Sequence, residues 1–239
     1  MLIIFRHDPL VYHPGEKFTY SSYGFNLLSA VIEGASGQGF LSYMDEHVFD
    51  PVGMRHTVAD RPARIIAKRT RFYARGPKGR LINAPYVNNS YKWAGGGFLS
   101  TPEDLCRFDA AHLRDDFLKQ ETIERLWTSQ HTNDGKETGY GIGWRVTTDE
   151  AGRRRVGHGG GSVGGSSQLV VYPEAKLILA VTANMSGIRY GDAHYHIAEL
   201  FLGDGEKAKT EEEAGDSMNW CWCGGQAGSR KSCIAMPQP

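Results

Sequence analysis

The sequence lacks any excess of charge, since 27 lysine and arginine residues balance 27 aspartate and glutamate residues in a chain of 239. A balanced chain creates no overall field that attracts a polyanion, so we predict no nucleic-acid partner. The sequence also lacks an apolar run of the roughly 20 residues that a transmembrane helix needs. Residues 1–9 hold too short an apolar stretch for a signal peptide, so they carry no targeting signal.

Cysteine is scarce, with four in the chain and three of them within the last twenty residues. Because Cys106 stands alone in a predicted helix, the four cannot form a disulfide framework across a core. The spacing of Cys221, Cys223 and Cys233 lacks the paired pattern of a zinc ribbon. The His-x-His pair at 194–196 is interpreted as packing or surface residues. We therefore predict no metal site.

What the sequence does have is six glycines gathered around one histidine in the run 156–165. Glycine lacks a Cβ, so a strand built from it can present bare backbone N–H groups to a ligand oxygen, as an oxyanion hole does. His158 beside those amides can give a hydrogen bond or a positive charge to the same ligand. A glycine-rich hairpin with an incidental histidine explains this run equally well, so other segments must decide.

Local patterns predict helices first and strands later in the chain. Apolar periodicity predicts helices over about 27–35, 40–48, 102–112, 120–127 and 192–202. Strand-like segments, joined by short turns and hence antiparallel, are predicted over about 141–146, 153–156, 167–172 and 177–183. Pro51 is expected to end the second helix, and either Ser100 or Thr101 to cap the third. The predicted fold class is α/β, an antiparallel sheet flanked by helices, with a helical and loop-rich subdomain.

The composition changes abruptly after Gly203. A charged run is followed by a stretch rich in glycine, serine and cysteine that has no apolar period. We therefore predict one domain over 1–203 and a disordered or aberrant tail over 204–239. The segment Trp-Cys-Trp-Cys at 220–223 is also compatible with a misjoined reading frame.

Five segments match, in order, the motifs of one family. They are 20–28 (YSSYGFNLL), 51–57 (PVGMRHT), 95–101 (GGGFLST), 139–144 (GYGIGW) and 158–160 (HGG). Together they resemble the serine β-lactamase and D-Ala-D-Ala peptidase superfamily, class C branch. The stretch 85–101 resembles its mitochondrial serine β-lactamase-like members in animals. The resemblance implies a β-lactamase/transpeptidase-like fold and acyl transfer through a covalent serine ester, a reaction that needs no metal or organic cofactor.

The resemblance also implies roles at the start of the first helix. Tyr20 stands where the family has its general base, although an ordinary aromatic at a helix entry is the alternative interpretation. Ser22 stands at a substrate-orienting position where asparagine is usual. A hydroxyl has a shorter reach and fewer donors than an amide, so we expect substrate orientation to differ from that in true β-lactamases.

Further roles implied by the resemblance fall on the glycine run. His158 occupies the position of a cation, and Gly161 is the expected oxyanion-hole donor through its backbone N–H. Gly159 and Gly160 are expected to line the substrate. Because Gly159 stands where a hydroxyl residue is usual, one contact to a substrate carboxylate is lost, which weakens the case for penicillin-type substrates.

The family's nucleophile motif, Ser-x-x-Lys, is missing, because no serine of this chain has lysine three residues later. The family places that motif before Tyr20, so we expect this chain to be the C-terminal part of a longer protein, inactive alone. The family's N-terminal strands pair with the last strand, so residues 177–183 are expected to have an unpaired edge here, open to aggregation or partner pairing.

The leading hypothesis is a serine hydrolase, a peptidase or amidase that takes a peptide or amide substrate. The resemblance implies a mitochondrial location, and the mitochondrial relatives are linked to lipid metabolism. One alternative is a noncatalytic scaffold that self-assembles into filaments. Another is an unrelated glycine-rich binding module, which requires no convergence of Tyr20 and His158 in space.

Overall fold

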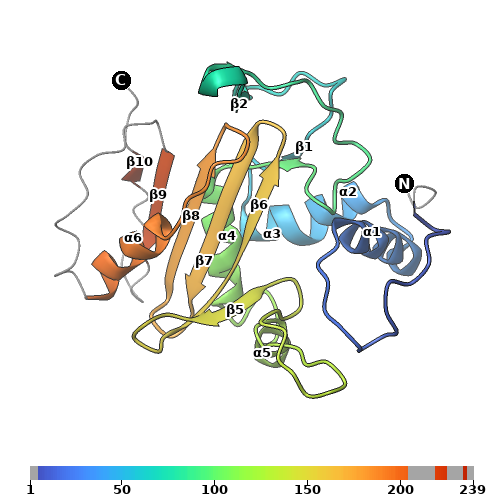
Figure 1. The fold of residues 1–239 in the computed structure, drawn as a ribbon, viewed down its shortest axis with the longest axis vertical. Helices are drawn as coiled ribbons and strands as arrows, with labels where there is room; N and C mark the ends of the chain where they lie inside the picture. Colours follow the sequence, from blue (N-terminus) through green and yellow to red (C-terminus); the bar gives the residue numbers. More distant parts are fainter. Residues whose placement is uncertain (1–4, 204–218, 225–233, 236–239) are drawn as a thin grey trace.

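A six-stranded antiparallel sheet forms the centre of the computed structural model, which describes residues 5–203, 219–224 and 234–235 (Figure 1). The strand order is β10-β9-β8-β7-β6-β5. The strands are β5 (Arg145–Thr148), β6 (Arg154–Ser162), β7 (Gly165–Tyr172), β8 (Leu177–Ala183), β9 (Asn219–Gly224) and β10 (Ile234–Ala235). The predicted antiparallel sheet flanked by helices is confirmed.

Helices cover both faces of this sheet, as Figure 1 shows for α4 and α6. The helices are α1 (Ser22–Ser36), α2 (Phe40–Met44), α3 (Asp50–Val52), α4 (Pro102–His112), α5 (Gln120–Leu126) and α6 (Ala193–Leu202). Ile178 of β8 packs in one core cluster with Cys106 of α4, whereas its neighbour Leu177 packs with Ala198 of α6. Successive residues of a strand point to opposite faces, so residues 177–181 of β8 are all apolar because the strand is covered on both faces.

The capping residues explain where two helices begin and end. Thr101 is the N-cap of α4, and its side chain accepts a hydrogen bond from the backbone N of Asp104 over 3.2 Å. Pro51 does not end the second helix, contrary to the sequence-based prediction. It follows a π-helical turn at Asp45–Phe49 and stands at the start of α3, where a missing N–H is tolerated. The helix ends instead at Gly53, whose φ of 75° is left-handed.

Two small two-stranded sheets lie in the loop-rich region. β1 (Val58–Ala59) pairs with β4 (Phe98–Leu99), and β2 (Tyr73–Arg75) pairs with β3 (Leu81–Asn83) around a 3₁₀ turn at Pro77–Gly79. This region carries the loop 87–97, which reaches the end of β6. Among the described residues, no helix has the length and apolar character that crossing a bilayer requires.

The edge of β8 is occupied rather than open. β9 pairs with β8 in antiparallel register, with Ala180 opposite Cys221. The prediction of an unpaired edge at 177–183 is therefore wrong for this structure, because six residues of the tail satisfy the backbone groups of that edge. Residues 219–224 and 234–235 thus form strands within the predicted disordered tail, whose other residues lie outside the described part.

The glycine run is part strand and part turn. β6 continues through Ser162, and Gly164 then adopts a φ of 82° in the turn to β7. Gly157 is close to the neighbouring strand, since a Cβ added there would lie 2.2 Å from the carbonyl oxygen of Leu169. The backbones of β6 and β7 therefore approach each other where a side chain does not fit, one residue before His158.

We expect Gly157→Ala to lower the free energy of unfolding by about 2 kcal/mol, because overpacking forces the two strands apart. Urea denaturation measures this loss. Gly161→Ala is the matched control on the same strand, since a Cβ there meets nothing within 4 Å. Equal losses in the two variants would contradict a packing origin.

Candidate active site

Three aromatic rings from separate segments converge beside β6. Tyr20 immediately precedes Ser21, the N-cap of α1, while His158 lies in β6 and Tyr140 just before β5. Ring centroids lie 5.5 Å apart for Tyr20 and His158, 6.1 Å for Tyr20 and Tyr140, and 5.8 Å for Tyr140 and His158. The structure thus brings Tyr20 and His158 together. An unrelated glycine-rich binding module would not require these two rings to meet.

Hydrogen bonds hold the His158 ring at both nitrogens. Its Nδ1 lies 2.7 Å from the carbonyl oxygen of Gly159, and its Nε2 lies 2.9 Å from the hydroxyl of Tyr140. A carbonyl oxygen only accepts, so Nδ1 must carry a proton. In the neutral imidazole Nε2 is then an acceptor, and the Tyr140 hydroxyl donates to it. This pair of bonds assigns the tautomer and fixes the ring orientation.

Burial shifts the pKa of both partners toward their neutral forms. Burial lowers the pKa of His158 below its ordinary value of 6.5, and the nearby Arg145 charge adds to the lowering, although the hydrogen bond to Gly159 opposes it. Burial, with a smaller contribution from Tyr20, raises the pKa of Tyr140 to about 12. At neutral pH the shifts favour a neutral imidazole beside a protonated phenol, rather than the cation that the resemblance implies for His158.

The glycines of β6 differ in how much space surrounds them. A Cβ at Gly159 would lie 2.5 Å from Oε1 of Gln168, and one at Gly160 would lie 3.0 Å from Oγ of Ser167. Gly161 has open space on that side. Gly159, which stands where the family usually has a hydroxyl residue, therefore lies next to the side-chain amide of Gln168.

Ser22 is the first residue of α1, two positions after Tyr20. Its carbonyl oxygen lies 2.8 Å from the position of a Cβ added to Gly95, so Gly95 packs closely on α1. Tyr20 is 44% exposed, which leaves it accessible to a substrate. The structure therefore places the start of α1 between the three-ring group and the loop 87–97.

Two residues of this region were not identified from the sequence. Tyr140 lies in the motif at 139–144, but the motif alone gives it no role, and its contact with His158 spans eighteen positions. Lys92 donates from Nζ to Oγ of Ser162 over 3.2 Å. Tyr140 lies in the motif at 139–144 and Lys92 in the stretch 85–101, and neither resemblance gave these residues a role.

The site offers groups suited to acyl transfer. A phenol can exchange a proton with a nucleophile, and backbone N–H groups of a glycine-rich strand can stabilise negative charge on a carbonyl oxygen. Among the described residues, no group of three His, Cys, Asp or Glu side chains is placed to hold a metal ion.

Comparison with protein families agrees with this geometry. The family model described as Beta-lactamase matches residues 1–200. The chain therefore belongs to the beta-lactamase family, a family of serine hydrolases. This membership accounts for the five ordered motifs and for the antiparallel sheet flanked by helices.

The chain is similar to curated relatives that are considerably longer. It is 39% identical over 198 residues to the serine beta-lactamase-like protein LACTB, mitochondrial, of Mus musculus, covering 72% of this chain and 36% of that protein. It is 30% identical over 186 residues to penicillin-binding protein 4* of Bacillus subtilis, covering 72% and 41%. The chain thus spans well under half the length of either relative.

Solved structures show the same fold. A penicillin binding protein from Bacillus halodurans aligns with a TM-score of 0.69 at 26% identity, covering 84% of this chain and 61% of that one. The octameric penicillin-binding protein homologue from Pyrococcus abyssi aligns with a TM-score of 0.68 at 25% identity, covering 94% and 56%.

Proposed function

We propose that this chain forms the base and oxyanion-binding side of a serine hydrolase that cleaves a peptide or amide through an acyl-enzyme. The convergence of Tyr20, Tyr140 and His158 beside the glycine-rich end of β6 carries this proposal. Relatives named as D-alanyl-D-alanine carboxypeptidases support the choice of an amide bond as the target.

The proposed reaction starts when a serine Oγ attacks the carbonyl carbon of the scissile amide. Tyr20, acting as the phenolate, takes the serine proton and passes it to the leaving amine nitrogen as the C–N bond breaks, which returns Tyr20 to the phenolate. The N–H of Gly161 donates to the carbonyl oxygen as it becomes negative. Loss of one such donor typically costs about 3 kcal/mol of transition-state stabilisation. Water then hydrolyses the serine ester.

In this scheme the hydrogen bond from Tyr140 holds the His158 ring next to Tyr20. Tyr140 donates to Nε2 of His158, and Gly159 accepts from Nδ1, so neither nitrogen needs to move during the reaction. A neutral His158 in this site acts through its fixed dipole, and Arg145, opposite Gly157 in the β5–β6 pairing, is the nearby permanent charge.

The nucleophile is proposed to come from a segment outside these 239 residues, because none of their serines has lysine three positions later. One helical turn between serine and lysine places the ammonium beside the hydroxyl. These 239 residues alone are then expected to be inactive.

Labelling with a fluorophosphonate probe tests this function. We expect no serine labelling of the 239-residue chain and clear labelling of a chain extended by the in-frame sequence upstream of Met1. A mass-spectrometric map of the labelled serine identifies the nucleophile. An extended chain that lacks Ser-x-x-Lys, or that carries it and stays unlabelled, would contradict the enzyme.

A noncatalytic, self-assembling scaffold is the second candidate. The relative from Pyrococcus abyssi is named as octameric, which supports assembly as a property of this fold. An extended chain that sediments as a large assembly but never labels favours this candidate.

The mouse, bovine and human relatives named as mitochondrial support the same location for this protein. Organelle fractionation checks this location. A link to lipid metabolism is part of the same proposal.

A further inference from the structure

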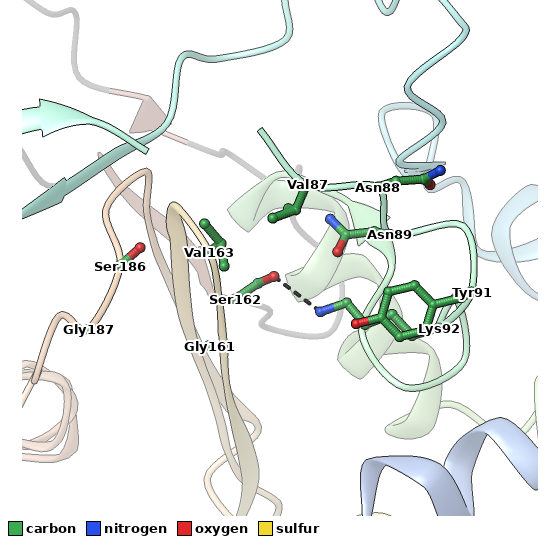
Figure 2. Close-up of a pocket in the computed structure, with 10 residues that line it drawn as sticks. All are labelled: Val87, Asn88, Asn89, Tyr91, Lys92, Gly161, Ser162, Val163, Ser186 and Gly187. Atoms are coloured by element: carbon green, nitrogen blue, oxygen red, sulfur yellow. Dashed lines mark hydrogen bonds between the residues drawn. The ribbon is translucent and has the colours of Figure 1, made fainter. Parts of the chain in front are cut away.

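Two cavities adjoin β6. Figure 2 shows the one of about 640 Å³ between the loop 87–92 and the end of the strand, which reaches Gly161 and belongs to the site already described. A second cavity, of about 350 Å³, is lined by residues of β5, β6, β7 and α6. Its lining includes Arg145 of β5 and Arg155 of β6, here called the arginine pair. This second cavity therefore presents two positive charges.

The arginine pair lies on the face of β6 opposite His158. The guanidinium carbon of Arg155 is 3.7 Å from the centre of the Tyr195 ring, so Arg155 points toward α6. Successive residues of a strand alternate between faces, so His158, three positions later, points the other way. Arg145 is opposite Gly157 in the β5–β6 register and shares its face with Arg155. Such diagonal neighbours are about 7–8 Å apart, a separation that two long side chains can bridge around one anion.

The acidic side chains of this region pair with other arginines. Nε of Arg153 lies 2.7 Å from Oδ2 of Asp149, and Nη2 of Arg154 lies 3.0 Å from Oε1 of Glu174. Within the part of the chain that the structure describes, no ion pair joins either member of the arginine pair to an aspartate or a glutamate. The two charges that face the second cavity are therefore uncompensated there.

Neutral groups surround the half-buried guanidinium of Arg155. Its Nε donates to Oγ1 of Thr147 over 3.0 Å, which leaves the four N–H groups of its Nη atoms for a ligand. The hydroxyl of Tyr172 and both ring nitrogens of His194 are buried, and no described residue forms a hydrogen bond with them. Burial lowers the pKa of His194 and Arg155 lowers it further, although Asp192 opposes the change, which favours a neutral ring at neutral pH. An anion that binds here would compensate a charge that water only partly solvates.

We propose that the arginine pair binds the phosphate group of a small phosphomonoester. Such a group carries close to two negative charges at neutral pH, which matches two guanidinium groups, whereas one carboxylate would compensate only one of them. The planar fork of an arginine can also hold two phosphate oxygens at once. The ligand lies behind the strand segment that carries His158, so it is distinct from the peptide or amide substrate.

The rest of the lining suits an organic group attached to the phosphate. It includes aromatic and aliphatic side chains, those of Val170, Ile188, Tyr190 and Tyr195. A cavity of about 350 Å³ is near the lower limit of small-molecule sites, which favours a compact ligand over a phosphorylated protein segment.

Titration of the 239-residue chain with phenyl phosphate, benzoate and benzyl alcohol tests this site. The three probes share a benzene ring and carry about two, one and no negative charges. We expect phenyl phosphate to bind about tenfold more tightly than benzoate, and benzyl alcohol to show no saturable binding. Amide chemical shifts at Thr147 and Gly157 should change with phenyl phosphate. Measurement at about 0.15 M salt screens the contribution of distant surface charges.

Substitution of each arginine locates the charge that is recognised. Arg145→Gln should weaken phenyl phosphate binding about tenfold, and because Arg145 is exposed the variant should fold normally. Arg155→Gln should weaken binding at least as much, since its charge is less accessible to water. Arg125→Gln, which changes an exposed arginine of α5, is the matched control and should keep the affinity of the unmodified chain. Thermal unfolding verifies that each variant folds.

Three results would each overturn the phosphate site. They are equal binding of phenyl phosphate and benzoate, an unchanged affinity in Arg145→Gln, and an affinity that is lost in Lys92→Gln but kept in Arg145→Gln. The last result would place the phosphate in the cavity of Figure 2, beside the Lys92–Ser162 hydrogen bond. None of these measurements requires a nucleophile, so the phosphate site and the proposed hydrolase, which fluorophosphonate labelling tests, can fail independently.

Discussion

Replacing Tyr20 with phenylalanine in the extended, nucleophile-bearing chain is expected to slow fluorophosphonate labelling by about 10²- to 10⁴-fold, the usual contribution of a positioned acid–base group. The substitution removes the hydroxyl and keeps the ring, which lies 5.5 Å from His158 and 5.7 Å from Phe25. Stability should therefore change little, so the loss reports on proton transfer rather than on folding.

Tyr23→Phe is the matched control for this substitution. Tyr23 lies one turn further along the same segment, is 46% exposed, and its ring contacts Phe5 rather than His158. Labelling rates of the control should match the unmodified protein. A similar rate in both variants would assign the proton transfer to another group and remove Tyr20 from the mechanism.

Asp104→Ala is expected to lower the free energy of unfolding by about 3 kcal/mol. The Asp104 carboxylate is fully buried and accepts from the backbone N of His56 over 2.7 Å and from Oγ1 of Thr57 over 2.9 Å. It also pairs with Arg107 over 3.2 Å. Removing the acceptor leaves these donors without their partner in a buried place, which is far more costly than losing a surface contact.

Urea denaturation measures this loss, with Asp116→Ala as the control. Asp116 pairs with Arg114 over 2.9 Å, but its side chain is 74% exposed, and exposed pairs contribute about 1 kcal/mol or less. A loss of similar size in the two variants would show that the network around Asp104 does not stabilise the fold.

This network matters for the site as well as for stability. Asp104 holds the segment at 56–57 against α4, and a few residues later Asp60 holds Asn89, which precedes Lys92. The buried carboxylates of Asp104 and Asp60 thus support the loop that carries Lys92 to the end of β6.

Residues with a local signature were predictable from the sequence. Thr101 followed by Pro102 indicates a helix start by cap chemistry, and the short apolar runs at 167–172 and 177–183, bounded by turns, indicate strands. The predictions for Tyr20 and His158 came from family motifs, and the structure places their rings side by side. Their catalytic roles, and those of Ser22, Gly159, Gly160 and Gly161, remain proposals.

Contacts between distant segments were not predictable. The bond from Tyr140 to His158 and that from Lys92 to Ser162 join residues eighteen and seventy positions apart, and neither has a spacing that one strand or helix imposes. β9 was missed for a related reason. The sequence around 219–224 has no apolar period that predicts a strand. The segment pairs through its backbone with β8, and a backbone pairing leaves no side-chain pattern to recognise.

The occupied edge of β8 limits how copies of this protein can join. With β9 and β10 in place, the outermost strands of the described sheet are β10, of two residues, and β5, of four. Such short borders offer few backbone groups for strand addition and are a common protection against it. A filament of these units would therefore grow through side-chain contacts between helices or loops, and a continuous intermolecular sheet would require β9 to be displaced first.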